Sequence, residues 1–150
     1  MSNYRPISLL TSFSKVFEKV IYSRLHYHIK SSNILAKEQY GFRNSSTETA
    51  LYNLINNILK VLNSKMWVGD IFCDLTKAFD YVNHNILLSK LEFYSITGRA
   101  NYLIKSYLND RYQRVLIRNK YSKNCFLEWE KVKQGVPQGS ILGPIFFLHQ

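Results

Sequence analysis

Residues 67–80 read Trp-Val-Gly-Asp-Ile-Phe-Cys-Asp-Leu-Thr-Lys-Ala-Phe-Asp, and this stretch decides the fold class. The part up to Asp74 is rich in β-branched and aromatic side chains, which predicts a short strand that ends at that carboxylate. A strand end holds a side chain firmly and leaves its tip exposed, so Asp74 is a candidate ligand for Mg²⁺. A second interpretation stays open, in which Asp74 caps the next turn and Asp80 is a solvated helix residue.

Two long helices are predicted before this strand. Apolar residues recur every three or four positions between residues 13 and 29, which indicates one apolar helix face, with Thr11 or Ser12 as its cap. Ser45 followed by Glu48 has the spacing of a capping box, and it begins the second helix. The residues expected on the first face are Phe13, Val16, Phe17, Val20, Ile21, Leu25 and Ile29, and those expected on the second are Leu51, Leu54, Ile55, Ile58 and Leu62.

Helices and then strands are predicted after Asp80. One helix should direct Ile86, Leu87, Leu91 and Ile96 inward and end at Gly98, and a shorter one should follow with Tyr102, Leu103, Tyr107 and Leu108. Apolar and polar residues alternate in residues 111–118 and 125–132, which indicates a hairpin. Because helices and strands segregate along the chain, the predicted class is α+β.

A glycine-rich loop follows the predicted hairpin. It reads Gln134-Gly135-Val136-Pro137-Gln138-Gly139-Ser140 and continues with Ile141-Leu142-Gly143-Pro144. Two glycines around a proline give a rigid loop whose backbone can approach a ligand closely, and its amides could face a phosphate or a base. The pattern is also typical of an ordinary turn before a helix.

Charge and composition restrict the classes of binding partner that this chain can have. The chain of 150 residues is 46% hydrophobic, which excludes intrinsic disorder, and its formal net charge of +10 at pH 7 favours nucleic acid. No apolar run is long enough to span a bilayer, and the amino terminus lacks a secretory signal. We therefore expect an intracellular protein of the cytoplasm or nucleus, without a membrane partner. Cys73 and Cys125 have no CxxC or Cys/His neighbours, so we expect reduced thiols packed in strands.

Four sequence blocks occur in one order. They are Asn3-Tyr4-Arg5-Pro6-Ile7-Ser8-Leu9-Leu10, Gln39-Tyr40-Gly41-Phe42-Arg43, Asp74-Leu75-Thr76-Lys77-Ala78-Phe79-Asp80-Tyr81-Val82-Asn83-His84, and the residues from Gln134 to Pro144 quoted above. Their order and spacing resemble the reverse transcriptase of non-LTR retrotransposons, in its jockey-like or LINE-type branch. The resemblance covers residues 3 to about 148.

This resemblance implies part of a right-hand polymerase fold, with fingers over residues 1–66 and an incomplete palm over residues 67–150. The implied function is RNA-directed DNA polymerisation by two-metal nucleotidyl transfer, with Mg²⁺ or Mn²⁺ as cofactor. The implied partners are an RNA template, a DNA primer and deoxynucleoside triphosphates.

The resemblance also implies roles for particular residues. Asp74 matches the first catalytic aspartate, a ligand of both metal ions, with the carbonyl of Leu75 beside it. Phe79 matches the aromatic position beneath the incoming sugar, where a ring excludes a 2′-hydroxyl. The loop residues that match the nucleotide-facing segment are Gln134, Gly135, Pro137, Gln138 and Gly139. Arg5 and Arg43 match basic positions of the fingers.

Basic and aromatic residues interleave between residues 99 and 133, as suits a groove that follows a nucleic-acid backbone. We therefore expect phosphate contacts from Arg111, Arg114 and Arg118, although a solvated basic hairpin fits the same pattern.

The chain departs from the family at its second metal-binding block, an aromatic-Ala-Asp-Asp turn expected downstream of Pro144. No Asp-Asp pair occurs in the sequence. We therefore expect this chain alone to be inactive. The alternative function is that of a non-catalytic nucleic-acid-binding remnant of a degraded retrotransposon.

Overall fold

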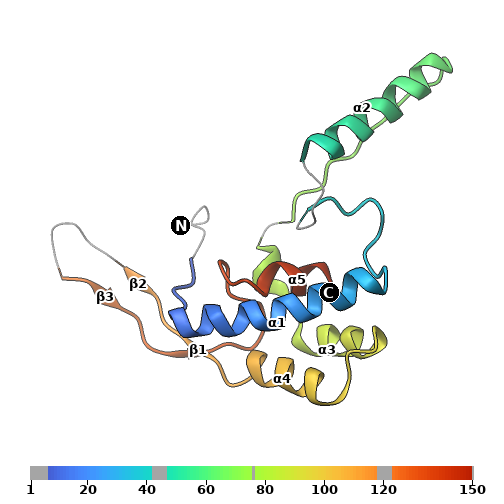
Figure 1. Cartoon of the computed structure of the whole chain (residues 1–150). Helices are drawn as coiled ribbons and strands as arrows, with labels where there is room; N and C mark the ends of the chain where they lie inside the picture. The colour runs from blue at the N-terminus through green and yellow to red at the C-terminus, as the bar shows by residue number, and fades with distance from the viewer. Residues whose placement is uncertain (1–6, 42–46, 76, 118–122, 150) are drawn as a thin grey trace. The chain divides into compact units, whose positions relative to one another are not determined.

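The computed structural model describes residues 7–41, 47–75, 77–117 and 123–149. Its helices are α1 (Ser12–Ser31), α2 (Thr47–Asn63), α3 (His84–Phe93), α4 (Gly98–Leu108) and α5 (Gly143–Leu148), with a short 3-10 helix η1 (Ala78–Tyr81) (Figure 1). Its strands are β1 (Tyr112–Gln113), β2 (Leu116–Ile117), β3 (Cys125–Phe126) and β4 (Glu130–Lys131). The mixture of helices with small antiparallel sheets agrees with the predicted α+β class.

The chain divides into two compact units. The first unit comprises Met1–Lys19 and Lys77–Gln150, and the second comprises Val20–Thr76. Helix α1 runs through the boundary between them. The division into fingers and palm that the family resemblance implies has different boundaries, and it stays a prediction.

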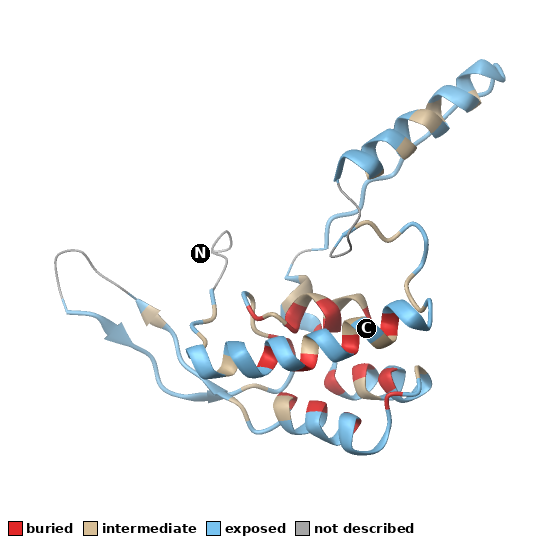
Figure 2. Cartoon of the chain, viewed as in Figure 1, coloured by how far each residue is buried: buried red, intermediate tan, exposed pale blue. Residues whose placement is uncertain are grey.

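The first unit holds most of the buried side chains (Figure 2). Helix α3 packs against α4, and η1 packs against α5. The buried apolar residues of this unit are Val82, Leu87, Leu91, Ile96, Ile104, Leu108, Val136, Leu142, Ile145 and Phe146. They come from every helix between residues 82 and 148, so the glycine-rich loop lies inside the best-packed part of the chain.

Helix α3 begins and ends at places that its sequence explains. The Asn83 side chain accepts hydrogen bonds from the amides of Asn85 and Ile86, which caps the first turn. At the other end Ser95 adopts a left-handed conformation, and the amide of Ile96 donates to the carbonyl of Leu91. Ile96 is buried, as expected, whereas Ile86 is exposed.

The predicted end of this helix at Gly98 is wrong. Because Ser95 already turns the chain, Gly98 becomes the first residue of α4. Of the four residues that indicated α4, Leu108 is buried and Tyr107 is half-buried, whereas Tyr102 and Leu103 are exposed and Ile104 is buried in their place. Apolar residues that recur every three or four positions indicate a helix, but they do not by themselves show which of two adjacent rows of side chains packs against the core.

Helix α1 forms as predicted, and the Thr11 hydroxyl accepts a hydrogen bond from the Ser14 amide at its start. Its buried stripe is shifted from the expected one. Phe13, Val16, Phe17 and Val20 are exposed, whereas Ile21, Leu25 and Ile29 are buried. Glu18 lies on the buried stripe, three residues before Ile21, and is fully buried. The helix therefore buries a carboxylate where the sequence suggested only apolar contacts.

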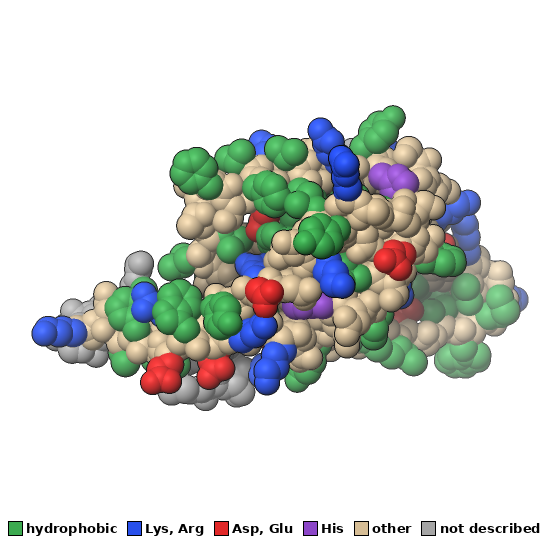
Figure 3. Space-filling model, turned by 90° about the horizontal axis from the view of Figure 1, so that it is seen from below, with side chains coloured by type: hydrophobic (Ala, Val, Ile, Leu, Met, Phe, Trp, Pro, Cys, Tyr) green, Lys and Arg blue, Asp and Glu red, His purple; other side chains and the backbone are tan. Residues whose placement is uncertain are grey.

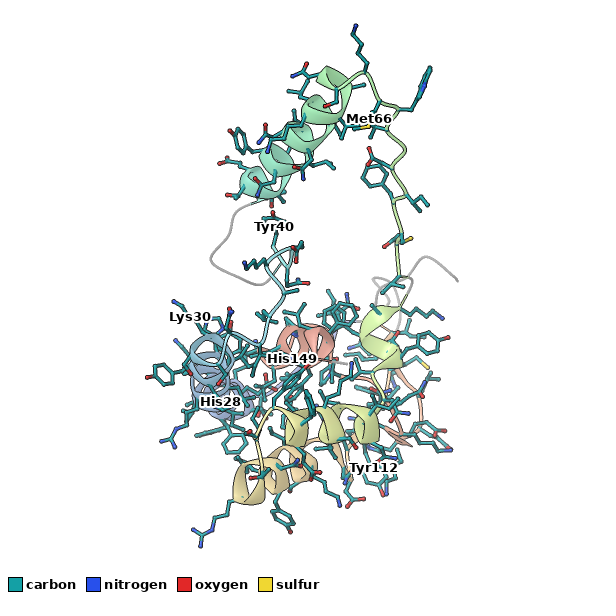
Figure 4. The ribbon with its side chains drawn as sticks, turned by 90° about the vertical axis from the view of Figure 1, so that its right-hand side faces the viewer. His28, Lys30, Tyr40, Met66, Tyr112 and His149 are labelled. Atoms are coloured by element: carbon teal, nitrogen blue, oxygen red, sulfur yellow. The ribbon has the colours of Figure 1, made fainter. Side chains whose placement is uncertain are left out.

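The second unit has fewer buried side chains than the first. Helix α2 forms as predicted, but none of its residues is buried, and its proposed cap Ser45 lies outside the described residues. The Tyr40 hydroxyl accepts a hydrogen bond from the Asn53 side chain at 2.7 Å. Figure 4 shows Met66 at the start of an extended segment, residues 66–75, from which side chains project.

The predicted strand over residues 67–74 is absent from the structure. Every residue from Met66 to Leu75 is exposed, and none of these residues is assigned to a strand. A β-rich sequence is a strand only when a neighbouring strand pairs with it, and no described segment does so here. Cys73 in this segment and Cys125 in β3 are free thiols, as expected, but both are exposed rather than packed.

The predicted hairpin forms as two antiparallel arms, residues 111–117 and 123–133, which we call the β-arm. Strand β1 pairs with β4, and β2 pairs with β3. Between these pairs one side has two residues, Arg114 and Val115, while the other has three, residues 127–129. The Leu127 amide donates to the Val115 carbonyl at 3.0 Å, so Glu128 and Trp129 together oppose Arg114. This is a one-residue β-bulge.

Candidate functional site

The 134–140 loop is fastened to η1, the helix that carries Phe79. The Val136 amide donates to the Phe79 carbonyl at 2.8 Å, and the Gly135 amide donates to the Val82 carbonyl at 2.8 Å. The half-buried Phe79 ring lies 5.4 Å from that of Phe147 in α5, centroid to centroid. The structure thus brings the backbone of Phe79, the residue predicted to face the sugar, against the glycine-rich loop, which is more than fifty residues away in the sequence.

Gly135 is required by this packing. Its φ of +85° is a conformation that side chains disfavour, and an added Cβ would lie 2.8 Å from the Asp80 carbonyl oxygen. Any larger residue would therefore push the loop away from η1. Asp80 itself is exposed, so its side chain takes no part in this contact.

His84 holds the start of the loop. Its side chain is buried, and its Nε2 lies 2.8 Å from the Gly135 carbonyl oxygen. Because a carbonyl oxygen only accepts, Nε2 must carry the proton and donate it. His84 is the first residue of α3, and sequence reasoning did not identify this contact.

Residues 137–139 of the loop are more open than Val136 and Ser140 on either side of them. Gly135, Val136 and Ser140 are buried, Pro137 and Gln138 are half-buried, and Gln134 and Gly139 are exposed. The Ser8 amide donates to the Gln138 carbonyl at 3.0 Å, and the Gly143 amide donates to the Ser140 hydroxyl at 2.8 Å. A loop fixed at both ends thus presents Gln138 and Gly139 toward solvent.

Glu18 holds the exit of the loop, and sequence reasoning missed it. One carboxylate oxygen accepts the Ile141 amide at 2.7 Å, and the other accepts the Tyr107 hydroxyl at 2.5 Å. Burial of a carboxylate is costly unless such donors replace water. The available signal was a charged residue at an apolar position, because Glu18 lies three and seven residues before two residues of the buried stripe, Ile21 and Leu25.

Tyr107 connects this carboxylate to Arg111. Burial raises the pKa of the Tyr107 hydroxyl well above its ordinary value, and the hydrogen bond to Glu18 adds to the shift. The hydroxyl therefore stays protonated and remains a donor at neutral pH. The Arg111 guanidinium lies 4.8 Å from the centre of the Tyr107 ring. Arg111 is half-buried in this network, unlike Arg114.

Arg114 lies between two aromatic rings of the β-arm. Its guanidinium carbon is 4.4 Å from the centre of the Phe126 ring and 4.6 Å from that of Trp129. Residues three apart on a regular strand point to opposite faces. The bulge shifts the register by one, so that both rings reach the same guanidinium.

Asp74 and Leu75 occupy a different environment. Both are exposed in the extended 66–75 segment of the second unit. Among the residues that the structure describes, no three His, Cys, Asp or Glu side chains gather closely enough to hold a metal ion. The described donors therefore do not complete the metal site that the resemblance implies. Arg5, Arg43 and Arg118 lie outside the described residues.

The described part of the chain contains no helix that is both long enough and apolar enough to cross a membrane.

Comparison with known proteins identifies the family. The family model described as Reverse transcriptase (RNA-dependent DNA polymerase) matches residues 1–149. No solved structure matches the chain.

Three relatives illustrate the similarity. The probable RNA-directed DNA polymerase from transposon BS of Drosophila melanogaster is 39% identical over 147 residues, and that from transposon X-element of the same species is 38% identical over 149 residues. The RNA-directed DNA polymerase from mobile element jockey of Drosophila funebris is 34% identical over 148 residues. These matches cover 97%, 97% and 98% of the chain, respectively, but only 16% of each relative.

These similarities confirm the resemblance that the four sequence blocks indicated, including its jockey-like branch. The chain spans about a sixth of the length of these curated relatives. Because the family model covers almost all of its residues, the chain belongs to the reverse transcriptase (RNA-dependent DNA polymerase) family.

Proposed function

We propose that this chain supplies the nucleotide-facing part of an RNA-directed DNA polymerase, which copies an RNA template from a DNA primer with deoxynucleoside triphosphates. The observation that carries the proposal is the packing of the 134–140 loop on η1. It puts the backbone of Phe79 within 2.8 Å of the loop, in a family whose members polymerise DNA. In the proposed site the Phe79 ring faces the sugar, and Gln134, Gly135, Pro137, Gln138 and Gly139 face the base and phosphates.

The loop is suited to this role by its rigidity. Binding costs less when the binding group is already ordered, because little conformational freedom is lost on association. Hydrogen bonds from His84 and to Glu18 hold the two ends, so the exposed Gly139 has a defined position before any nucleotide arrives. A glycine at φ +98° there also allows close approach of a ligand to the backbone.

Asp74 is the proposed catalytic carboxylate of this chain, with the Leu75 carbonyl beside it. Mg²⁺ or Mn²⁺ is the expected cofactor because hard cations of this kind prefer oxygen ligands. Within the described part of the chain, Asp74 belongs to no group of three His, Cys, Asp or Glu side chains, so it would supply only part of the ligands of such a cation.

The nucleotide proposal is tested by titrating the ¹⁵N-labelled chain with dATP and with ATP. We expect dATP to shift the amide signals of Gln138 and Gly139, and ATP to bind more weakly, because the Phe79 ring leaves no room for a 2′-hydroxyl. Phe79→Ala keeps the backbone bond to Val136 but should bring the two affinities closer together. Phe93→Ala, which removes an exposed ring from the same unit, is the matched control.

Two results would contradict the proposal. One is a titration in which dATP shifts amide signals elsewhere in the chain to saturation but leaves those of the loop unshifted. The other is an equal response of the Phe79→Ala and Phe93→Ala variants, which would show that the ring has no special place near the sugar.

A second candidate function, nucleic-acid binding without catalysis, is favoured by the β-arm. The described part of the arm carries Arg111, Arg114, Lys123, Lys131 and Lys133 against Glu128 and Glu130. Contacts from such side chains to phosphates release counterions, so affinity should fall by roughly tenfold or more between about 50 and 200 mM salt. A salt-independent affinity for oligonucleotides, measured by fluorescence anisotropy, would contradict this function. The same contacts are expected in the polymerase, where Arg5, Arg43 and Arg118 would add to them.

A further inference from the structure

The bulge of the β-arm gathers basic and aromatic side chains on one face. Residues alternate between the two faces along each strand, so Tyr112 and Arg114 share a face, and Lys131 joins them because it pairs with Tyr112. Glu130 pairs with Gln113 and therefore belongs to the opposite face. Figure 3 shows a basic side chain flanked by hydrophobic ones on the arm, while acidic side chains lie along one edge.

The aromatic rings of this face are accessible. The exposed fraction is 52% for Phe126, 60% for Trp129 and 60% for Tyr112. Aromatic side chains of this size are normally buried in a core or an interface. The rings of Phe126 and Trp129 both lie against the Arg114 guanidinium, and exposed rings of this kind suit stacking against another flat group.

Arg114 keeps its hydrogen-bonding capacity in this arrangement. A guanidinium that stacks on rings directs its N–H groups outward in its own plane. Within the described part of the chain these groups have no hydrogen-bond or ion-pair partner, whereas Lys131 on the same face is paired with Asp110 at 2.7 Å. Arg114 is therefore the cation of this face best placed to bind a phosphate.

We propose that this face of the β-arm is a stacking platform for single-stranded nucleic acid, with Phe126 and Trp129 contacting bases and Arg114 contacting the backbone. The proposal deepens the nucleic-acid contacts of the proposed function and rests on them. It assigns to Arg111 a different role, because that side chain packs on Tyr107 at the base of the arm.

A single strand fits this face better than a duplex or a protein. Stacking requires the flat face of a base, which a duplex hides between neighbouring base pairs, and each stacked base contributes enough to be measured on substitution. A protein partner of matching charge would need carboxylates next to Arg114, and stacked bases need none because the backbone supplies the negative charge. Protein binding is accordingly an outcome that the test must be able to reveal.

The test uses the two tryptophans of the full chain. The Trp67→Phe variant leaves Trp129 as the single tryptophan, and the Trp129→Phe variant leaves Trp67, which is fully exposed in the other unit. We expect an unstructured strand of about ten nucleotides, as DNA or as RNA, to quench Trp129 fluorescence by stacking and to leave that of Trp67 unchanged. A duplex of the same length should not quench Trp129.

Affinities of substituted chains separate stacking from charge. Trp129→Ala should weaken single-strand binding by about tenfold or more and duplex binding by little, with Trp67→Ala as the matched control. Arg114→Lys keeps the charge but loses the planar stack, so it should lower the preference for single strands while preserving the salt dependence. Deletion of Glu128 removes the bulge but leaves Trp129 directly opposite Arg114 on the same face, so it should retain the preference for single strands.

Several outcomes would overturn the platform. Unquenched Trp129, equal losses on single strands and duplexes, or binding only to an acidic protein would each do so. Failure to bind any oligonucleotide would also overturn it, while the dATP titration would still decide the nucleotide proposal independently. If the deletion variant fails to fold, Arg114→Lys and Trp129→Ala keep the platform open to refutation, because both leave the paired strands intact.

Discussion

The 134–140 loop and the 66–75 segment each hold residues that we propose for one reaction, but their surroundings differ. The loop is fixed by backbone bonds to Phe79 and Val82, by the buried His84 and by the buried Glu18. The segment that carries Asp74 is exposed throughout. The contrast teaches that the described residues hold the loop of the proposed nucleotide site in place, whereas they provide no comparable contacts around the proposed catalytic carboxylate.

The largest difference in the free energy of unfolding is expected between alanine substitutions of two phenylalanines, one buried and one exposed. Phe146 is 1% exposed in the first unit, and Phe72 is 83% exposed in the 66–75 segment. Phe146→Ala should lower the free energy of unfolding by about 3–5 kcal/mol, because it leaves a cavity, while Phe72→Ala should change it by less than about 0.5 kcal/mol. Urea denaturation followed by circular dichroism measures both. Similar losses in the two variants would break the comparison.

Two glycines give the next contrast. Gly135→Ala forces an alanine into φ +85° against the Asp80 carbonyl and should cost about 2–4 kcal/mol. Around Gly69 in the 66–75 segment, no other atom lies within 4 Å of an added Cβ. Gly69→Ala should therefore be neutral within about 0.5 kcal/mol. The same denaturation assay applies, and a stable Gly135→Ala chain would show that the loop can leave η1 at little cost.

Glu18 tests how the loop is held at its exit. Glu18→Gln leaves only one acceptor oxygen for two donors, so it should cost about 1.5–3 kcal/mol and speed hydrogen exchange of the Ile141 amide. Glu92→Gln, an exposed substitution in α3 of the same unit, is the matched control and should do neither. Unchanged exchange at Ile141 in Glu18→Gln would mean that the carboxylate does not position the loop.

Protonation of His149 should have the smallest effect. Its ring is buried in the first unit beside Tyr94, with centroids 5.5 Å apart, and Figure 4 shows it next to α5. Burial lowers the pKa of His149 below its ordinary 6.5, and Lys90 adds to the shift.

The unfolded chain therefore takes up a proton at a higher pH than the folded chain does. The free energy of unfolding should be highest above about pH 6.5 and should fall as the pH drops below that value. His149→Phe should flatten this dependence, as measured by urea midpoints across the range. An undiminished slope in that variant would assign the effect to other groups.

Local sequence patterns predicted which helices and strands form better than they predicted which residues of each element are buried. The periods of α1, α2 and α3 and the alternation in the β-arm were enough to identify these elements, because such patterns reflect geometry within one element. Burial depends on what other elements contribute, so the sequence placed Phe13 and Val16 inside and did not place Glu18 there. The strand over residues 67–74 was predicted from composition, but a strand needs a partner that no periodicity in its own sequence can supply.

The site shows the same division. The family resemblance singled out Phe79 and the 134–140 loop, and the structure shows that they are in contact. The resemblance did not show that His84 and Glu18 hold the loop. The His84 contact joins residues 51 positions apart in the chain, and the Glu18 contact joins residues 123 positions apart. The bulge that turns Trp129 toward Arg114 depends on the register between two strands, which neither strand encodes alone.

The extended conformation of residues 66–75 has a consequence for proteolysis. A protease binds several residues of its substrate as an extended, accessible backbone, and most folded segments must open locally before they fit. This segment is exposed already, and it is preceded by Lys65 and followed by Lys77, both in left-handed conformations. Brief trypsin treatment should therefore cut the chain first at these two lysines, and it would release the peptide that carries Asp74 while the packed helices after it stay whole.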